Sequence, residues 1–191
     1  MEKQNKPKLV LVDLDGTLFD TVAVNAASYR AALAELGYTV SDDYYAAHCN
    51  GGYYKDFLRP LMGGSPAAAQ VERVHDRKKA LYGSCLGAAR KNEGLFTILQ
   101  ALRPACHLGL VTTGSRRNAT EILAHFGCLD WFELILTQED VVNNKPDPEG
   151  YQKAMAHFGA APADTIIFED SAPGIAAAKA AGAQVFVAAQ F

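Results

Sequence analysis

Short apolar runs recur along the chain, and segments with helical spacing separate them. The runs are rich in Val, Ile, Leu and Phe and occupy residues 9–12, 108–111, 134–136, 165–168 and 185–187. They are continuously apolar instead of alternating with polar residues, which is typical of parallel strands that are covered on both faces. The pattern therefore predicts an α/β fold, a doubly wound parallel sheet of the Rossmann-like kind.

Helices are predicted between these strands, over residues 94–103, 116–126, 148–158 and 173–181. The last of them has Pro173 near its start and Gly182 just beyond its end. Proline is favoured in the first turn of a helix and glycine directly after the last turn, so these two residues mark the start and the end of this helix.

The stretch between the first strand and residue 94 contains no convincing strand. Its first part predicts a helix that ends at Gly37. The apolar residues on one face of this helix are Val22, Ala26, Tyr29, Leu33 and Leu36. A second helix is predicted to open at Ser65–Pro66 and to carry Val71, Val74 and Leu81.

A loop of that length without structure would be improbable in a compact domain. We therefore expect a small α-helical cap subdomain, inserted after the first strand and connected by hinges near residues 19–22 and 88–94. The predicted boundaries are a catalytic core at 1–20 and 91–191 and a cap at 21–90. A cap on two hinges can close over the carboxyl ends of the strands, where open α/β sheets bind ligands.

Composition narrows the class of protein further. Of the 191 residues, 49% are hydrophobic and 20% are charged, which is typical of a globular chain and excludes disorder. A net charge of -3 gives no long-range attraction for nucleic acid or an anionic membrane, and no apolar run reaches the roughly 18 residues of a bilayer span. We therefore expect no nucleic-acid or membrane partner. We expect the protein to be a monomer or a weak dimer.

The first eight residues carry charges, and the apolar run that follows at 9–12 is shorter than that of a secretory signal. Four dispersed cysteines argue against a zinc knuckle or a disulfide framework; they are Cys49, Cys85, Cys106 and Cys128. Together these features indicate a cytoplasmic protein.

Paired acids follow the first strand, at Asp13 and Asp15, and Gly16 permits a sharp turn directly after them. Residues two apart at a strand end point the same way. Paired carboxylates brought to a crevice are costly unless a cation is present. The alternative is a plain turn with a surface cap, but the apolar strand before the pair and the Gly-Thr after it favour a cation site.

Three further predicted strands also end in polar groups. The second ends at Thr112, followed by Thr113, Gly114 and Ser115 at a helix start, an arrangement that suits a phosphate. Lys145 comes after the third strand, and Glu169 and Asp170 after the fourth. Each signal alone has an ordinary explanation, as a helix cap or a solvated charge.

Taken together, these stretches resemble the haloacid dehalogenase-like hydrolase superfamily, in the branch that has a helical cap after the first motif. The matching segments are DLDGTLFDT (13–21), LVTTGS (110–115), NKPDP (144–148) and FEDSAPGIAAAKAAG (168–182). Within the superfamily the chain is most similar to the phosphoglycolate phosphatase and β-phosphoglucomutase group.

This resemblance implies a Mg²⁺-dependent phosphatase that acts on a small phosphorylated metabolite, such as a sugar phosphate. Asp13 would be the nucleophile that forms an aspartyl-phosphate, and Asp15 the general acid and base. Lys145 would neutralise charge on the nucleophile and the phosphoryl oxygens.

The resemblance also implies the binding groups. Thr112, with the amides of Thr113 and Gly114, would hold the phosphate together with Lys145. Mg²⁺ would be bound by Asp13, the carbonyl of Asp15, Asp170 and, as an outer ligand, Glu169.

Two alternatives remain, a phosphomutase and a non-catalytic phosphate-binding regulatory protein. The second acid, Asp15, argues for phosphoryl transfer over dehalogenation, because a halide leaving group needs no proton. Related mutases carry a histidine ten residues after that acid, where this chain has Asn25. Gly174 is a second departure, since many relatives have an acid there.

Substrate specificity is expected on the cap, in a polar loop at residues 48–55. Its glycines give flexibility, and Tyr54 and Lys55 offer an aromatic ring and a cation to the non-phosphate end of a substrate. These side chains can equally belong to the cap core or to its solvated surface.

Overall fold

The computed structural model describes residues 8–49, 52–63, 65–188 and 191. The chain divides into two compact units. Met1–Asp20 and Arg90–Phe191 form the first, called here the sheet unit, and Thr21–Ala89 forms the second, the helical unit.

Five parallel strands make up the sheet unit, in the order β5-β4-β1-β6-β7. They are β1 (Lys8–Val12), β4 (Cys106–Val111), β5 (Leu134–Leu136), β6 (Thr165–Glu169) and β7 (Gln184–Val187). All five coincide with the predicted apolar runs to within two residues at either end, and the predicted Rossmann-like α/β fold is confirmed.

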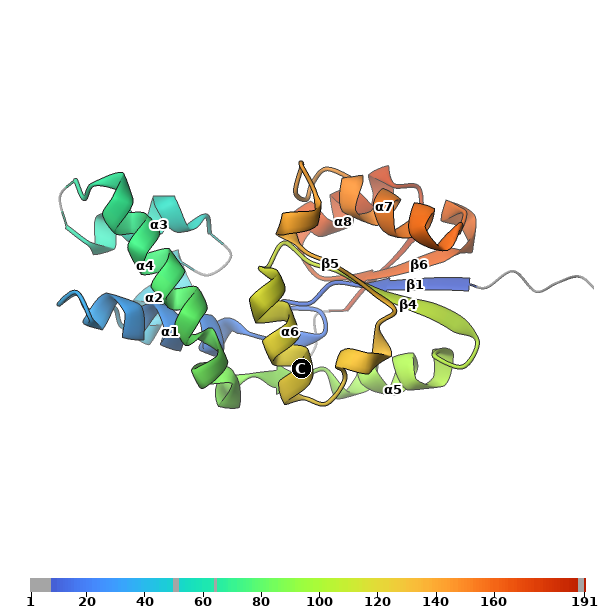
Figure 1. The fold of residues 1–191 in the computed structure, drawn as a ribbon, viewed down its shortest axis with the longest axis horizontal. Coiled ribbons are helices and arrows are strands. Elements are labelled where there is room, and N and C mark those ends of the chain that lie inside the picture. Colours follow the sequence, from blue (N-terminus) through green and yellow to red (C-terminus); the bar gives the residue numbers. More distant parts are fainter. Residues whose placement is uncertain (1–7, 50–51, 64, 189–190) are drawn as a thin grey trace, which may run out of the picture. The chain divides into compact units, whose positions relative to one another are not determined.

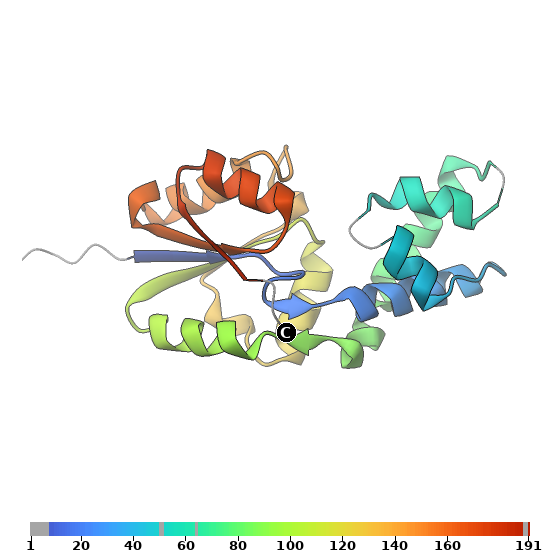
Figure 2. The same ribbon diagram turned by 180° about the vertical axis from the view of Figure 1, so that it is seen from behind.

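Helices cover both faces of this sheet (Figures 1 and 2). On one face lie α5 (Glu93–Leu102) and α6 (Arg116–His125), and on the other α7 (Glu149–Phe158) and α8 (Ala172–Ala180). Short 3-10 turns join some of these elements, at Leu129–Trp131, Gln138–Asp140 and Pro162–Asp164. The predicted start and end of α8 are confirmed, because Pro173 lies in its first turn and Gly182 follows the helix with a φ of +81°.

The two faces of β1 explain why its sequence is continuously apolar. Leu9 and Leu11 are fully buried in a cluster with side chains of α7 and α8, among them Tyr151 and Ala177. Successive strand residues point to opposite faces, so Val10 meets the other helical layer, where it is also buried. Each fully buried aliphatic side chain contributes roughly 1.5–3 kcal/mol, so this strand anchors the unit.

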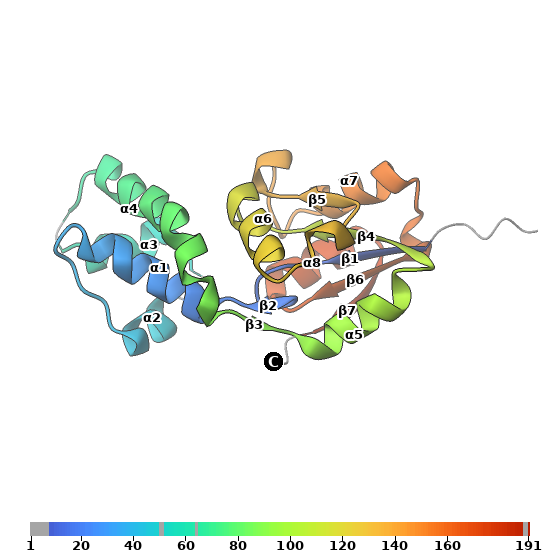
Figure 3. The ribbon, with the colours of Figure 1, turned by 60° about the horizontal axis from the view of Figure 1, so that its bottom comes forward.

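A two-stranded antiparallel ribbon stands where the chain leaves and re-enters the sheet unit (Figure 3). It pairs β2 (Phe19–Asp20) with β3 (Arg90–Lys91). The prediction that the stretch after the first strand contains no strand is therefore wrong at both of its ends. Strands of two residues are too short to show a period in the sequence.

The helical unit contains α1 (Val22–Ala34), α2 (Asp42–His48), α3 (Tyr54–Leu61) and α4 (Ala68–Leu81), followed by a 3-10 helix at Tyr82–Ala88. Its core includes three residues of the predicted apolar face, Ala26, Tyr29 and Leu33. The other two are exposed, Val22 by 38% and Leu36 by 39%, because Val22 is the first residue of α1 and Leu36 lies beyond its end.

The second predicted helix, α4, begins at Ala68, two residues after Pro66. There the Gln70 side chain accepts a hydrogen bond from the Ala67 amide at 3.0 Å. Val71 and Val74 are buried as predicted, and Leu81 packs against the same core.

All four cysteines are free thiols, as their spacing predicts. None of the helices in the described part of the chain combines the length and apolar character needed to cross a bilayer.

Candidate active site

The strand order brings three sequence motifs to one edge of the sheet. β1 lies between β4 and β6, so the residues that follow these three strands are neighbours. The Asp13 amide extends the ladder by donating to the Phe168 carbonyl at 3.0 Å, and the Thr112 amide donates to the Leu136 carbonyl at 2.9 Å. Asp13, Thr112 and Glu169 therefore stand at adjoining carboxyl ends.

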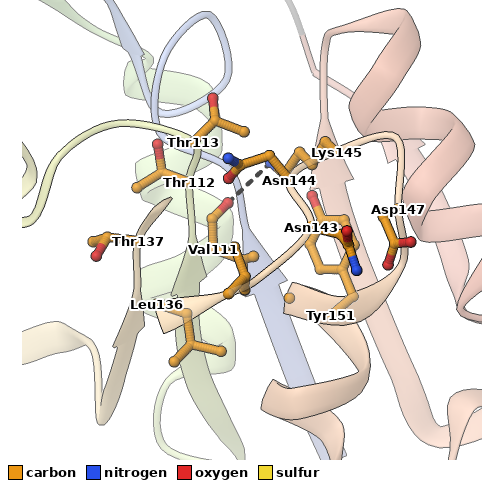
Figure 4. A pocket seen from close by; sticks show the side chains of 12 residues that line it. Val111, Thr112, Thr113, Leu136, Thr137, Asn143, Asn144, Lys145, Asp147 and Tyr151 are labelled. Carbon is orange, nitrogen blue, oxygen red and sulfur yellow. Dashed lines mark hydrogen bonds between the residues drawn. The ribbon is translucent and has the colours of Figure 1, made fainter. Parts of the chain in front are cut away.

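Lys145 joins this edge from the loop before α7. Its Nζ donates to Asp13 Oδ1 at 2.6 Å, to Glu169 Oε1 at 2.6 Å and to the Val111 carbonyl at 3.0 Å. Figure 4 shows the side chain reaching the Val111 carbonyl beside Thr112 and Tyr151. An ammonium has three protons, and all three have acceptors, so the position of this buried cation is fixed.

Glu169 is a fully buried carboxylate that the surrounding protein saturates with donors. Its Oε1 accepts from Lys145 and from the Tyr151 hydroxyl at 2.9 Å. Its Oε2 accepts from the amides of Asp170 and Ser171, at 2.9 and 3.0 Å, and from the Ser171 hydroxyl at 3.1 Å. Such a set of donors satisfies a buried carboxylate that would otherwise be costly.

Asp170 is oriented by the loop that follows the first strand. Thr17, itself fully buried, donates from Oγ1 to Asp170 Oδ1 at 2.8 Å. Gly16 has a φ of +87°, and a Cβ built there would lie 2.1 Å from Asp170 Oδ2. The glycine is thus required twice, for the left-handed turn and for the close approach of the carboxylate.

Three carboxylates of this edge form a group that suits a divalent cation. Asp13, Glu169 and Asp170 offer oxygen atoms that all lie within 4.8 Å of one another. Hard cations prefer oxygen ligands, and the single charge of Lys145 offsets only part of the repulsion among three clustered carboxylates. The residues of the site therefore fit a divalent metal.

The electrostatics of the site agree with that fit. Burial raises the pKa of Asp13 to about 7; Lys145 opposes the shift and Glu169 adds to it. Burial likewise raises the pKa of Asp170 above its ordinary value, against the hydrogen bond from Thr17. The two carboxyls are therefore harder to ionise without a cation than a solvated aspartate is.

Lys145 and Glu169 stay charged in spite of their burial. Burial acts to lower the pKa of Lys145, but the negative charge of Asp13 and that of Glu169 outweigh it and raise the pKa above the ordinary value. For Glu169, burial is outweighed by the charge and hydrogen bond of Lys145, so its pKa lies below the ordinary value.

The loop after β4 lies against Asp15. A Cβ built on Gly114 would be 3.2 Å from Thr112 Oγ1 and 3.5 Å from Asp15 Oδ2, so the hydroxyl and the carboxylate share the space beside this glycine. The Gly114 amide donates to Thr112 Oγ1 at 2.9 Å, and Ser115 caps α6 by accepting from the Asn118 amide. Thr113 is exposed at the same helix start.

Neighbouring arginines are held by protein carboxylates. Arg116 forms an ion pair with Asp140, and its amide donates to Glu139. Arg117 donates from Nε to Glu121 at 2.8 Å. These contacts tie the start of α6 to the segment after β5 and to its own next turn.

Tyr54 and Lys55 belong to the helical unit, at the start of α3. The Tyr54 hydroxyl donates to Glu72 Oε2, and Lys55 Nζ pairs with Glu72 Oε1, both at 2.8 Å. The expectation of a continuous loop at 48–55 is wrong for these two residues and for His48, the last residue of α2, because all three are helical. Asn50 and Gly51, in the same predicted loop, lie outside the described residues.

Three residues of the site were not predicted from the sequence. Thr17 lies inside the first motif, where the sequence indicates only a turn. At Tyr151 the sequence indicates only a residue on the apolar face of a helix. Asn92 caps α5 and donates from Nδ2 to the Thr17 carbonyl at 3.0 Å, which ties the first motif to that helix. No local pattern distinguishes such residues from ordinary core or capping residues.

A parallel sheet with an ammonium and carboxylates at adjoining strand ends defines an α/β enzyme whose site lies at the carboxyl edge of the sheet. The sequence profile described as haloacid dehalogenase-like hydrolase matches residues 10–188. The chain therefore belongs to the haloacid dehalogenase-like hydrolase family, and the predicted membership and enzyme class are confirmed.

Named relatives come from several bacteria. A phosphorylated carbohydrates phosphatase of Thermotoga maritima is 29% identical over 178 residues, which cover 91% of this chain and 81% of the relative. A phosphoglycolate phosphatase of Thiobacillus denitrificans is 31% identical over 185 residues, 94% of this chain and 82% of the relative.

The fold is shared with a solved structure of CbbY from Rhodobacter sphaeroides in complex with phosphate. The TM-score is 0.83 at 23% identity, and the match covers 97% of this chain and 87% of CbbY.

Proposed function

We propose that this protein is a Mg²⁺-dependent phosphatase that hydrolyses a small phosphomonoester through an aspartyl-phosphate intermediate. The observation that carries the proposal is the position of the Lys145 ammonium, 2.6 Å from Asp13 Oδ1 at the carboxyl end of β1. An ammonium fixed against a carboxylate nucleophile reduces the repulsion that an incoming phosphate dianion would meet.

The size of that repulsion shows why cations are needed. A carboxylate and a phosphate oxygen about 4 Å apart repel by roughly 4 kcal/mol per charge pair at an effective dielectric constant near 20. Asp13, Asp170 and a phosphate dianion carry four negative charges. Lys145 and a bound Mg²⁺ bring that sum to one negative charge, and Glu169 adds a second.

Asp13, the Asp15 carbonyl and Asp170 would hold the Mg²⁺, with Glu169 as an outer ligand. When bound, the ion favours the ionised form of Asp13 and withdraws charge from the phosphoryl oxygens.

In the first chemical step a carboxylate oxygen of Asp13 attacks phosphorus, and the bond from phosphorus to the ester oxygen breaks. Asp15 gives its proton to the departing alkoxide. In the second step Asp15 takes a proton from a water molecule that attacks the same phosphorus. The bond to Asp13 then breaks, and inorganic phosphate leaves.

Thr112 and the amides of Thr113 and Gly114 would hold the phosphate at the start of α6, where backbone amides and the helix dipole favour an anion. The Gly114 amide lies close to Thr112 Oγ1 in this structure, so binding there exchanges an internal hydrogen bond for one to the phosphate.

The helical unit would serve as the cap that selects the substrate, with Tyr54 and Lys55 among its contacts. The names of the Thermotoga and Thiobacillus relatives support a sugar phosphate or another small phosphorylated metabolite as the substrate class.

A phosphomutase is the second candidate function, and one observation weighs against it. Asn25 donates from Nδ2 to Thr21 Oγ1 at 3.2 Å, and its Oδ1 accepts from Lys78 Nζ at 2.6 Å. A side-chain amide has no proton to exchange near neutral pH, unlike the histidine of related mutases. A non-catalytic regulatory role is opposed by the presence of both acids and the lysine.

The test is a screen of purified protein against phosphorylated metabolites in Mg²⁺ buffer, with phosphate release and isomer formation measured in the same samples. Phosphate release without isomers supports the proposal. Isomer formation in excess of phosphate release would establish the mutase, and neither product from any substrate would favour the regulatory protein.

A further inference from the structure

Tyr151 is a buried tyrosine whose hydroxyl is directed at the charged centre of the site. The residue lies on α7 and is 1% exposed. Its hydroxyl donates to Glu169 Oε1 at 2.9 Å, on the same oxygen that accepts from Lys145. A hydroxyl is needed for this contact, whereas phenylalanine would fill the same space in the core.

The tyrosine ring makes a second contact with the same cation. Lys145 Nζ lies 5.1 Å from the centre of the Tyr151 ring, which is within the range of a cation–π attraction. Burial raises the pKa of the Tyr151 hydroxyl above its ordinary value, so the hydroxyl keeps its proton and can donate it to Glu169 near neutral pH.

The shared oxygen makes the tyrosine and the lysine depend on each other. Glu169 Oε2 is already held by the Asp170 and Ser171 amides and the Ser171 hydroxyl, which fixes one end of the carboxylate. The Tyr151 hydroxyl fixes the other end. Without it, Oε1 would have Lys145 as its one described donor, and the carboxylate would be free to turn about its fixed end.

We propose that Tyr151 is a positioning residue that acts through Glu169 to hold the Lys145 ammonium against Asp13. The proposal deepens the proposed function and rests on it for its catalytic consequence, because Lys145 is the group that neutralises charge there. Tyr151 would act through its contacts with Glu169 and Lys145.

The first test is a double-mutant cycle on kcat/KM with Tyr151→Phe and Glu169→Ala. Tyr151→Phe keeps the ring and removes one hydrogen bond to a charged group, so we expect a loss of roughly tenfold. In the Glu169→Ala background the same change should cost less than about twofold, because the acceptor is gone. An equal loss in both backgrounds would show that Tyr151 does not act through Glu169.

The second test needs neither catalysis nor metal. Purified protein is treated with a trace of acetic anhydride, and the acetylation rate of each lysine is measured by peptide mass spectrometry. Lys78, buried in the helical unit, and Lys153, exposed on α7, serve as internal references. In Tyr151→Phe we expect Lys145 to be acetylated several-fold faster and both reference lysines to keep their rates.

An unchanged rate at Lys145 would overturn the proposal, and so would a common rise at Lys145 and Lys78, which would indicate general loosening. Tyr29→Phe is the matched control, since it removes another buried hydroxyl, bonded to His75 at 2.8 Å, and should leave the Lys145 rate unchanged. If the protein released no phosphate from any substrate, the proposed function would fail while the labelling still decided the role of Tyr151.

Discussion

The carboxylate of Glu169 lies directly over the α-carbon of Gly174. A Cβ built on Gly174 would fall 1.7 Å from Glu169 Oε1 and 2.3 Å from Oε2. A side chain at position 174 and the observed position of Glu169 therefore exclude each other. The position of this buried glutamate, five residues earlier in the chain, therefore depends on a glycine at position 174.

Gly174→Ala should consequently push Glu169 away from Lys145 and lower kcat/KM by about tenfold or more, since one hydrogen bond to a charged group is lost. Gly94→Ala is the matched control, because a Cβ there would meet the nearest atom at an ordinary 3.7 Å. Steady-state rates of the two variants check the prediction, and equal rates would contradict it.

Asp13→Asn should fold normally and lose at least about three orders of magnitude in phosphate release, because an amide cannot form the covalent intermediate. Thermal unfolding establishes the fold, and acid-quenched mass spectrometry should detect a phosphorylated Asp13 in the parent protein alone. Asp164→Asn, an exposed acid of the sheet unit, is the control. Substantial turnover by Asp13→Asn would disprove the nucleophile assignment.

Removal of divalent metal should abolish activity, and added Mg²⁺ should restore it. The three clustered carboxylates also predict a gain in stability, since a ligand that binds the folded state raises the melting temperature in a concentration-dependent way. Calorimetric scans of dialysed protein with increasing Mg²⁺ measure that gain. Full activity after exhaustive dialysis against a chelator would rule out the metal requirement.

Lys55→Ala and Tyr54→Ala should reduce selectivity among substrates. We expect the kcat/KM ratio between the best metabolite and a simple aryl phosphate to fall by about tenfold, the effect of one lost contact to a charged group. Arg77→Ala is the control, because Arg77 pairs with Glu35 elsewhere on the helical unit. An unchanged ratio in both cap variants would place the specificity contacts elsewhere.

His75 should make the stability of the protein depend on pH. Burial, with the charges of Lys79 and Lys78, lowers its pKa from 6.5 to about 4, against the smaller effects of Asp76 and Glu72. The unfolded chain therefore binds more protons than the folded one between these values. The free energy of unfolding should fall as the pH falls from 6.5 towards 4.

Urea denaturation followed by circular dichroism at pH 7 and pH 5 measures this loss. His75 is partly exposed, so the slope should stay below the limiting value of about 1.4 kcal/mol per pH unit for one proton. The free energy of unfolding of His75→Phe should depend less on pH than that of the parent protein, and His157→Gln should show the same dependence as the parent. A variant at position 75 with the parent slope would contradict the prediction.

The sequence by itself determined the layers of the sheet unit and the ends of its strands. In runs such as residues 9–12 and 165–168 the side chains that point to either face of the strand are apolar. This pattern is local, so it can be recognised without knowledge of the partner strands. For the same reason Asp13 and Asp170 could be placed at strand ends, and the motif around Lys145 could be matched to a family.

Only the tertiary structure decided which groups meet. Lys145 and Asp13 are 132 residues apart, and their 2.6 Å contact follows from the strand order, which no local pattern encodes. The roles of Tyr151 and Gly174 depend on the same packing, because both are defined by the space around Glu169. Local sequence reports backbone preference and burial, whereas contacts across the sheet depend on how the whole chain packs.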